Sequence, residues 1–305
     1  MTSLNLRKNN IELSIIILSF NTSDLTLQTI NSIYESTDFN TLSFEVIVLD
    51  NASSDGSIKE LEKLIDKCEN FKLIKSNVNL GFSKGNNLAF RQAAGKYILF
   101  LNSDIIVKKG SIEALYAFAE ENDDNANFFG GKLFNKDHTP QASAGPFYSL
   151  PVVFGALFLK GDYWGLTRSS PRVNCKKDWV SGACLMTKKE TFNLVGGFDE
   201  KIFMYMEEID LLYRAKKQGF KTFFCSNAEF IHLGSASSQG KKYPILQVYH
   251  GFLYFHKKHH GQFSILILKV MLQLKSVISI WIGKITNNTY LISTYEEAKN
   301  ITKMA

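Results

Sequence analysis

The chain has 305 residues, 45% of them hydrophobic and 21% charged, a composition that is ordinary for a globular protein and excludes a disordered one. Its net charge of +6 suits anionic ligands or an anionic membrane surface, but it is too small to indicate a nucleic-acid-binding protein. The four cysteines show no CxxC spacing, so the sequence predicts neither a zinc site nor a disulfide framework. The first ten residues lack an apolar signal core, and we expect a reducing, cytoplasmic location.

Short apolar runs alternate with amphipathic segments through the first third of the chain. Strands are predicted at 12–21, 44–50, 71–74 and 96–107, and helices after Thr22–Asp24, over 58–67 and over 88–94. This alternation is typical of an α/β fold with a doubly wound, mostly parallel sheet.

The apolar run from Lys96 to Val107 is interrupted by Asn102, Ser103 and Asp104. Polar side chains are costly to place at the tip of a buried strand for packing alone. In open α/β sheets, ligands lie beyond the carboxyl ends of the strands, so Asp104 is a candidate ligand for a metal or for the phosphate side of a nucleotide. The alternative is a simple turn, because Asn, Ser and Asp are common turn formers.

Other polar residues and two glycines also fall at predicted strand ends or helix starts. They are Asn21, Asp50, Asn51, Ser53, Gly81, Lys84, Gly85 and Asn86. Right-handed crossovers bring these ends to one edge of the sheet, and such an edge is suited to hold a nucleotide. The sequence contains no GxxxxGK[ST] loop or GxGxxG fingerprint, which removes the main support for an ATPase or a dinucleotide-binding protein.

A series of motifs runs through most of the chain in a fixed order. They are Ser14–Asn21, Val48–Ser57, Asn79–Asn87, Leu101–Asp104, Trp179–Cys184, Gly196–Glu200, Phe203–Leu211 and His232. Together they resemble family 2 glycosyltransferases of the GT-A fold, and most closely the rhamnosyltransferase-like enzymes of bacterial surface polysaccharide synthesis. The resemblance implies a Rossmann-like GT-A domain over 1–261, with a nucleotide-binding half at 11–107 and an acceptor and catalytic half at 108–261.

The resemblance also implies a reaction. The enzyme would move a sugar from dTDP-rhamnose or a UDP-sugar to a saccharide or lipid-linked saccharide, with inversion and with Mn²⁺ or Mg²⁺ on Asp104 and His232. Asn102 stands where the family has the first acid of its Asp-x-Asp motif. A hydrogen-bonded core residue is the alternative for His232.

The resemblance assigns further residues to the nucleotide sugar. The expected set is Ser19, Asn21, Asp50, Ser53, Gly81, Lys84, Asn86, Asn102, Ser103, Trp179, Gly182 and Ala183. Asp50 would hold the base and Lys84 would lie near the pyrophosphate, whereas Trp179 could equally be a core residue.

Glu207, Glu208 and Asp210 are the candidate acids and bases. In the family a Glu-Asp pair occupies the first two of these positions and its second acid is the general base, so the resemblance implies Glu208 in that role, with Glu207 and Asp210 as rivals. Acids at a helix start are also favoured by the helix dipole, and Arg214 lies at ion-pair spacing from Asp210.

Two later segments have less definite roles. Residues 137–172 are predicted to form a long loop that touches the acceptor. Residues 262–305 are predicted to form a helical tail, and lysines within its apolar span argue for an amphipathic helix in the membrane interface at the inner face of the plasma membrane. A helix packed on the catalytic domain is the alternative.

Two rival functions remain open from the sequence. A nucleotidyltransferase also places carboxylates at strand ends around a metal, although it usually has a basic glycine-rich loop near the N-terminus. A catalytically weak nucleotide-sugar-binding module would account for Asn102 and Glu208, which both depart from the family pattern.

Overall fold

The structure is a computed structural model that describes residues 11–122, 127–234 and 242–304. Its strands are β1 (Leu13–Ser19), β2 (Phe44–Asp50), β3 (Phe71–Lys75), β4 (Tyr97–Asn102), β5 (Ile105–Val107), β6 (Phe128–Phe134), β7 (Pro140–Gln141), β8 (Ala144–Gly145), β9 (Cys175–Lys177), β10 (Trp179–Val180), β11 (Cys184–Lys188) and β12 (Thr222–His232). Its helices are α1 (Ser23–Ser36), α2 (Ser57–Glu62), α3 (Gly81–Phe90), α4 (Ser111–Glu121), α5 (Leu150–Phe158), α6 (Lys189–Val195), α7 (Glu207–Lys217), α8 (Lys242–His259), α9 (Gly261–Ile285) and α10 (Thr289–Met304).

A mixed central sheet organises the molecule, with the strand order β3-β2-β1-β4-β11-β6-β12-β5. The first four strands pair in parallel, β11 runs antiparallel to both β4 and β6, and β12 pairs in parallel with β6. The parallel part is the strand–helix alternation predicted from the sequence. The interruption after β4 has a structural reason, because β5 leaves the line of β4 and pairs with β12 at the far edge.

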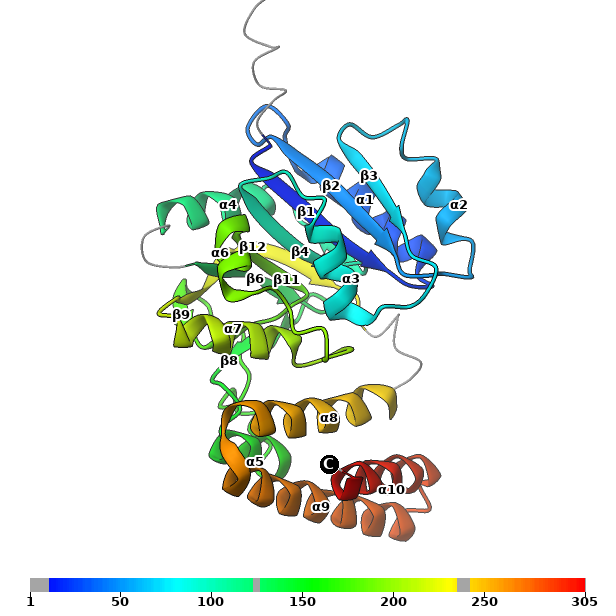
Figure 1. Cartoon of the computed structure of the whole chain (residues 1–305), viewed down its shortest axis with the longest axis vertical. Coiled ribbons are helices and arrows are strands. Elements are labelled where there is room, and N and C mark those ends of the chain that lie inside the picture. The colour runs from blue at the N-terminus through cyan, green and yellow to red at the C-terminus, as the bar shows by residue number, and fades with distance from the viewer. Residues whose placement is uncertain (1–10, 123–126, 235–241, 305) are drawn as a thin grey trace, which may run out of the picture.

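Both faces of the sheet are covered by helices (Figure 1). Ile15 and Ile17 of β1 pack in one apolar cluster with residues of α1, α2 and α4. Ile16 faces the other cluster, which includes residues of α3, α6 and α7. Burial on both faces explains why β1, β2 and β4 are nearly continuous apolar runs rather than alternating ones.

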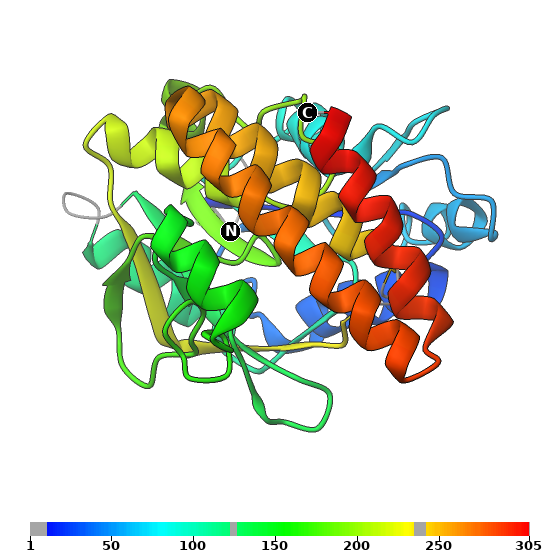
Figure 2. The same ribbon diagram turned by 90° about the horizontal axis from the view of Figure 1, so that it is seen from below.

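The C-terminal helices form a separate layer below the sheet domain (Figure 1), and the view from below shows α9 lying beside α5 and α10 (Figure 2). The helix α8 packs against α9 and α10 and also contributes Tyr249 and Phe252 to the core that contains Met206 at the start of α7. The helical layer therefore begins at α8, before the expected boundary at residue 261.

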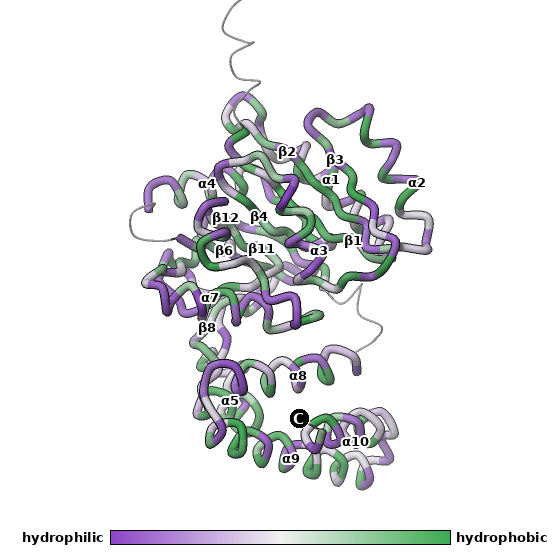
Figure 3. Tube along the Cα trace, viewed as in Figure 1, coloured by the Kyte–Doolittle hydropathy of each residue, from purple (hydrophilic) through white to green (hydrophobic). Residues whose placement is uncertain are grey.

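Two segments predicted as loops are helical. The helix α3 begins at Gly81 rather than near residue 88, because Gly81 takes a left-handed backbone at φ +75° and its N–H donates to the Asn79 side chain at 2.9 Å. A Cβ at Gly81 would lie 2.6 Å from Phe203, so the close approach of that loop also requires glycine. The predicted 137–172 loop contains α5, whose sequence is apolar nearly throughout (Figure 3).

Candidate active site

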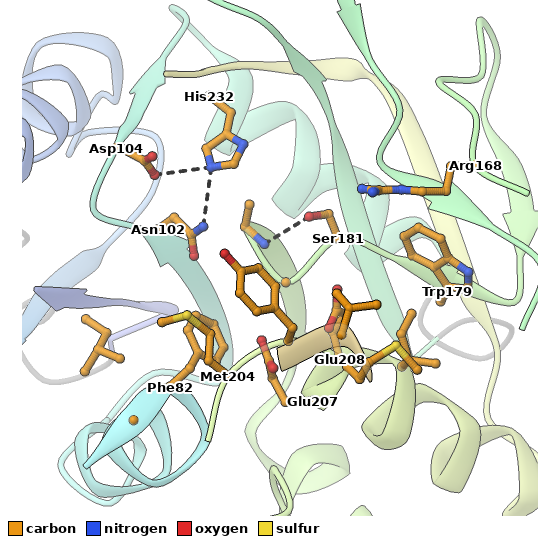
Figure 4. Close-up of a pocket in the computed structure, with 18 of the residues that line it drawn as sticks. Phe82, Asn102, Asp104, Arg168, Trp179, Ser181, Met204, Glu207, Glu208 and His232 are labelled. Atoms are coloured by element: carbon orange, nitrogen blue, oxygen red, sulfur yellow. Dashed lines mark hydrogen bonds and ion pairs between the residues drawn. The ribbon is translucent and has the colours of Figure 1, made fainter. Parts of the chain in front are cut away.

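A cavity of about 520 Å³ opens beyond the carboxyl ends of the parallel strands (Figure 4). One part, which we call the strand-end side, is lined by Asn102, Asp104, Gln141 and His232. A second set, which we call the loop side, comes from the connection between β8 and β9 and from α8: Tyr148, Leu157, Asp162, Arg168, Val248 and Phe252. Glu207 and Glu208 lie between the two sides, at the start of α7.

Asp104 and His232 are brought together by the pairing of β5 with β12, which places His232 opposite Ile105. Asp104 Oδ1 lies 3.2 Å from His232 Nε2, and the side-chain nitrogen of Asn102 lies 3.5 Å from the same ring atom. The structure thus joins two residues that are 128 positions apart in the sequence and were both expected to bind metal.

The other nitrogen of His232 has its own partner. Nδ1 lies 2.7 Å from the side-chain oxygen of Gln141, which fits an Nδ1–H donor and leaves the Nε2 lone pair facing Asp104. Two ligands in neighbouring positions on one octahedral ion lie roughly 3 Å apart, so the spacing of Asp104 and His232 fits Mn²⁺ or Mg²⁺. The described residues contain no group of three or more His, Cys, Asp or Glu that could hold a metal, so the remaining ligands would be phosphate or water.

Glu207 and Glu208 follow an unusual backbone turn. Tyr205 and Met206 both take left-handed conformations, at φ 66° and 74°, which non-glycine residues adopt rarely. This turn aims both acids at the cavity. Each has one carboxylate oxygen that is buried without a hydrogen-bond partner among the described residues.

Burial raises the pKa of both acids. It raises the pKa of Glu207 well above the ordinary value, and the neighbouring Glu208 raises it further. Burial also raises the pKa of Glu208, although hydrogen bonds from backbone N–H groups, including that of Gly182, and the charge of Arg168 act in the opposite direction. Glu207 is only 6% exposed, whereas Glu208 is half-buried, so Glu208 is the more accessible carboxylate.

Asp210 does not line the cavity. It is fully buried, and its oxygens lie 2.7 Å from Arg214 Nε, Lys258 Nζ and His259 Nε2. Burial opposes its charge, but these partners outweigh that effect and hold its pKa below the ordinary value. A carboxylate held in this way is a poor proton acceptor, so the structure gives Asp210 a structural role that ties α7 to α8.

The expected base-binding residues lie near the strand ends but outside the cavity lining. Asp50 accepts a hydrogen bond from the Ser53 N–H at 2.9 Å, and Ser53 accepts one from the Asn21 N–H at 2.9 Å. The second oxygen of Asp50 is buried and has no partner among the described residues. Ser19 is buried and pairs with Thr26 at 2.9 Å, which indicates a structural role.

The remaining expected residues divide into two groups. The cavity is lined by Gly81, Ser103, Trp179, Gly182 and Ala183. Lys84 and Asn86 lie on α3 and do not line it: Lys84 is exposed, and Asn86 donates within the helix to the Phe82 carbonyl at 3.0 Å. Trp179 is 2% exposed and its indole N–H donates to the Pro146 carbonyl at 2.8 Å, so it belongs to both the core and the cavity wall.

Several lining residues were not predicted. Asn51 was placed at the correct edge but given no role; its amide bonds to Asn79, Leu80 and Gly81 and fixes the loop before α3. Gln141 and Arg168 come from the segment predicted as a loop without periodicity. No sequence pattern marks them, because their approach to the cavity depends on the fold of α5 and β7.

Comparisons with known proteins agree with this geometry. A protein-family model described as "Glycosyl transferase family 2" matches residues 14–166, half of the chain. The chain is 27% identical over 237 residues to the N-acetylglucosaminyl-diphospho-decaprenol L-rhamnosyltransferase of Mycobacterium tuberculosis (strain ATCC 25618 / H37Rv), covering 71% of this chain and 76% of that protein. It is 29% identical over 195 residues to the low-salt glycan biosynthesis hexosyltransferase Agl10 of Haloferax volcanii, covering 62% and 58%.

Solved structures share the fold. The mannosyltransferase PcManGT from Pyrobaculum calidifontis, in complex with GDP-Man and Mn²⁺, matches with a TM-score of 0.58 at 14% identity, over 97% of this chain and 76% of that chain. GalNAc-T7 with UDP, GalNAc and Mn²⁺ matches with a TM-score of 0.59 at 15% identity, over 82% and 50%. The GT-A fold expected from the sequence is confirmed.

Proposed function

We propose that this chain, which belongs to glycosyl transferase family 2 and is a glycosyltransferase, works by an inverting, metal-dependent reaction. The donor would be a nucleoside-diphosphate sugar, either dTDP-rhamnose or a UDP-sugar, and the acceptor a saccharide or lipid-linked saccharide of a cell-surface polysaccharide. One observation carries the proposal: the Asp104–His232 pair and the two acids Glu207 and Glu208, each with one carboxylate oxygen that lacks a partner among the described residues, border the same cavity.

Asp104 and His232 would hold Mn²⁺ or Mg²⁺, which as a Lewis acid would stabilise the departing diphosphate. Gln141 orients the His232 ring, and Asn102 adds an amide beside it. Asp50, at the end of β2, offers its free oxygen to the N–H of a uracil or thymine ring. Because Asp50 has no exposed surface, this contact requires neighbouring residues to move.

Glu208 would act as the general base. Its carboxylate takes the proton of the acceptor hydroxyl while that oxygen attacks the anomeric carbon from the face opposite the diphosphate, and a single displacement inverts the configuration. The raised pKa makes Glu208 a stronger base than an exposed carboxylate.

The test is an assay of donor cleavage with Mn²⁺, with Mg²⁺ and with EDTA, using dTDP-, UDP- and GDP-sugars. We expect release of a nucleoside diphosphate from one donor class, only with a divalent ion. Release of pyrophosphate from a nucleoside triphosphate would instead indicate a nucleotidyltransferase. Tight donor binding without any cleavage, with or without an acceptor, would indicate a binding module.

We also propose that α9 contacts a membrane surface. Among the described residues, it is the one helix with the length and composition to cross a membrane, but one side of it is packed against α8 and α10. The other side is an exposed apolar stripe, formed by Phe263, Leu266, Val270, Leu274, Val277, Trp281 and Ile285. The helix carries three lysines and no acid, so a helix lying flat on an anionic surface fits better than a crossing one.

Vesicle co-sedimentation tests this contact. The double substitution of Leu274→Glu with Trp281→Glu should lower binding to anionic vesicles by roughly tenfold or more, because two exposed apolar side chains are lost. Leu194→Glu, at an exposed apolar residue on α6, is the matched control and should bind as the parent does. Equal binding by all three proteins, or no binding by the parent, would contradict the contact.

A further inference from the structure

We propose that Arg168 binds a phosphate of the acceptor, and that the acceptor is therefore a saccharide joined through phosphate to an apolar chain. This inference rests on the proposed function and assigns a role to the loop side of the cavity. Figure 4 shows the guanidinium of Arg168 directed into the cavity, on the side away from Asp104 and His232.

The charge of Arg168 lowers the pKa of Glu208, but Arg168 forms no ion pair with a carboxylate within the described residues. Its Nη2 donates to the Ala142 carbonyl at 3.2 Å, and its guanidinium lies 5.6 Å from the centre of the Trp179 ring. Its Nε is buried without a hydrogen-bond partner, and within 11–122, 127–234 and 242–304 no acid lies at ion-pair distance from it. Arg214 makes the contrast clear, because its Nε lies 2.7 Å from Asp210.

The loop side contains one acid, and it does not pair with Arg168. Asp162 also lines the cavity, but it accepts a hydrogen bond from the Thr167 hydroxyl rather than pairing with Arg168. A guanidinium that forms no ion pair and is directed into a cavity is suited to phosphate, which it can bind through two parallel hydrogen bonds. A neutral sugar hydroxyl would not compensate for the burial of this charge as well.

The position of Arg168 identifies which phosphate it would meet. The donor diphosphate would lie with the metal at Asp104 and His232, and Arg168 lies across the cavity from that pair, near enough to Glu208 for its charge to lower the pKa of Glu208. The acceptor hydroxyl must reach Glu208, so the rest of the acceptor extends toward Arg168. A second anion is therefore expected on the acceptor.

The walls around Arg168 indicate the chemistry of the group attached beyond the phosphate. Leu157 of α5 and Val248 and Phe252 of α8 line the same cavity as Arg168. Tyr163, Trp164 and Leu166, which precede Arg168 in the same connection, are exposed apolar residues. In the proposed complex the saccharide would contact Glu208, the phosphate would contact Arg168, and the apolar chain would contact Leu157, Val248 and Phe252.

Two acceptor probes test the assignment: one saccharide joined to farnesol through a diphosphate, and the same saccharide joined to farnesol directly. We expect Arg168→Gln to raise the KM of the diphosphate probe by roughly tenfold, the loss of one charge-assisted hydrogen-bonded pair, with the donor KM and the neutral probe's KM unchanged. Arg168→Lys should recover part of the loss. Arg172→Gln, at an exposed arginine nearby, is the matched control and should behave as the parent.

Binding gives a second measurement that does not require transfer. Calorimetry in EDTA should show farnesyl diphosphate binding to the parent more tightly than farnesol, and roughly tenfold more weakly to Arg168→Gln. A rise in donor KM instead of acceptor KM would place Arg168 on the donor, and equal binding of farnesyl diphosphate to parent and variant would overturn the inference. Failure of the parent to cleave any donor, with the binding difference intact, would count against the proposed function alone.

Discussion

The two sides of the cavity are built in different ways. On the strand-end side, Asn102, Asp104 and His232 are held by the sheet itself, and contacts of 3.5 Å or less join His232 to Asn102, Asp104 and Gln141. On the loop side, Arg168 comes from a long connection, while Val248 and Phe252 come from the appended helix α8. The first side has the rigidity that a regular sheet gives to its side chains, whereas the second is built from segments outside the sheet.

The largest loss of activity is expected from Glu208, which belongs to neither side. Glu208→Gln should lower kcat by roughly 10³-fold, because it removes the proton acceptor without removing a binding group from either side. The donor KM should stay within a few-fold of the parent value. A steady-state assay with saturating metal measures both constants, and a larger loss in Glu207→Gln than in Glu208→Gln would move the base to Glu207.

Substitutions on the strand-end side should have a smaller effect, which is a loss of metal affinity. Asp104→Asn should weaken Mn²⁺ affinity by on the order of 100-fold, because it removes a charged ligand, and Gln141→Leu by about tenfold, because it only releases the His232 ring. Mn²⁺ binding followed by electron paramagnetic resonance measures both without transfer. Farnesyl diphosphate binding in EDTA should be unaffected by either change. If it weakened as much as Mn²⁺ binding, the division of the cavity into two sides would be wrong.

The pH dependence of the acid pair should give the next effect. The base must be deprotonated, so kcat should rise with pH through a value above the ordinary 4.5 and then level off. The folded state holds the Glu207 proton more tightly than the unfolded state does, so the free energy of unfolding should fall as pH rises through the window above 4.5.

The slope is at most about 1.4 kcal/mol per pH unit for one proton. Urea unfolding at a series of pH values measures it, and Glu207→Gln should flatten it. Asp210 contributes in the opposite direction and at lower pH, since its pKa is held below the ordinary value and its contribution is lost on acidification. A parent whose stability rises with pH throughout the window above 4.5 would show that Glu207 is charged when folded.

The same division explains what the sequence could predict. Asp104 was predicted as a ligand because a carboxylate at the tip of an apolar strand is costly without a function, and Glu208 was predicted as the base from the resemblance; both line the cavity. These residues lie on regular elements, whose periodicity is visible in the chain. The pairing of β5 with β12 was not visible, although it is what brings His232 to Asp104.

The loop side was beyond sequence reasoning for a physical reason. Arg168 and Gln141 follow no repeat, and their positions depend on α5, on the β8–β10 pairing and on the helical layer. Lys84 was expected in the loop before the helix, but the Asn79 cap starts α3 at Gly81, so Lys84 lies on the helix and is exposed. Its expected position near the pyrophosphate stays a prediction.

The ion-pair cluster at Asp210 joins the C-terminal helices to the catalytic part of the molecule. Lys258 and His259 of α8 bind Asp210 on α7, the helix that also carries Glu207 and Glu208, and Lys258 lies 2.6 Å from Asp199. Cutting the chain after Gly261 would strip α9 and α10 from α8 and leave Leu246 and Tyr249 facing water. A truncated protein would then be soluble or insoluble for reasons unrelated to lipid, so surface substitutions on an intact chain are the sounder way to separate attachment from turnover.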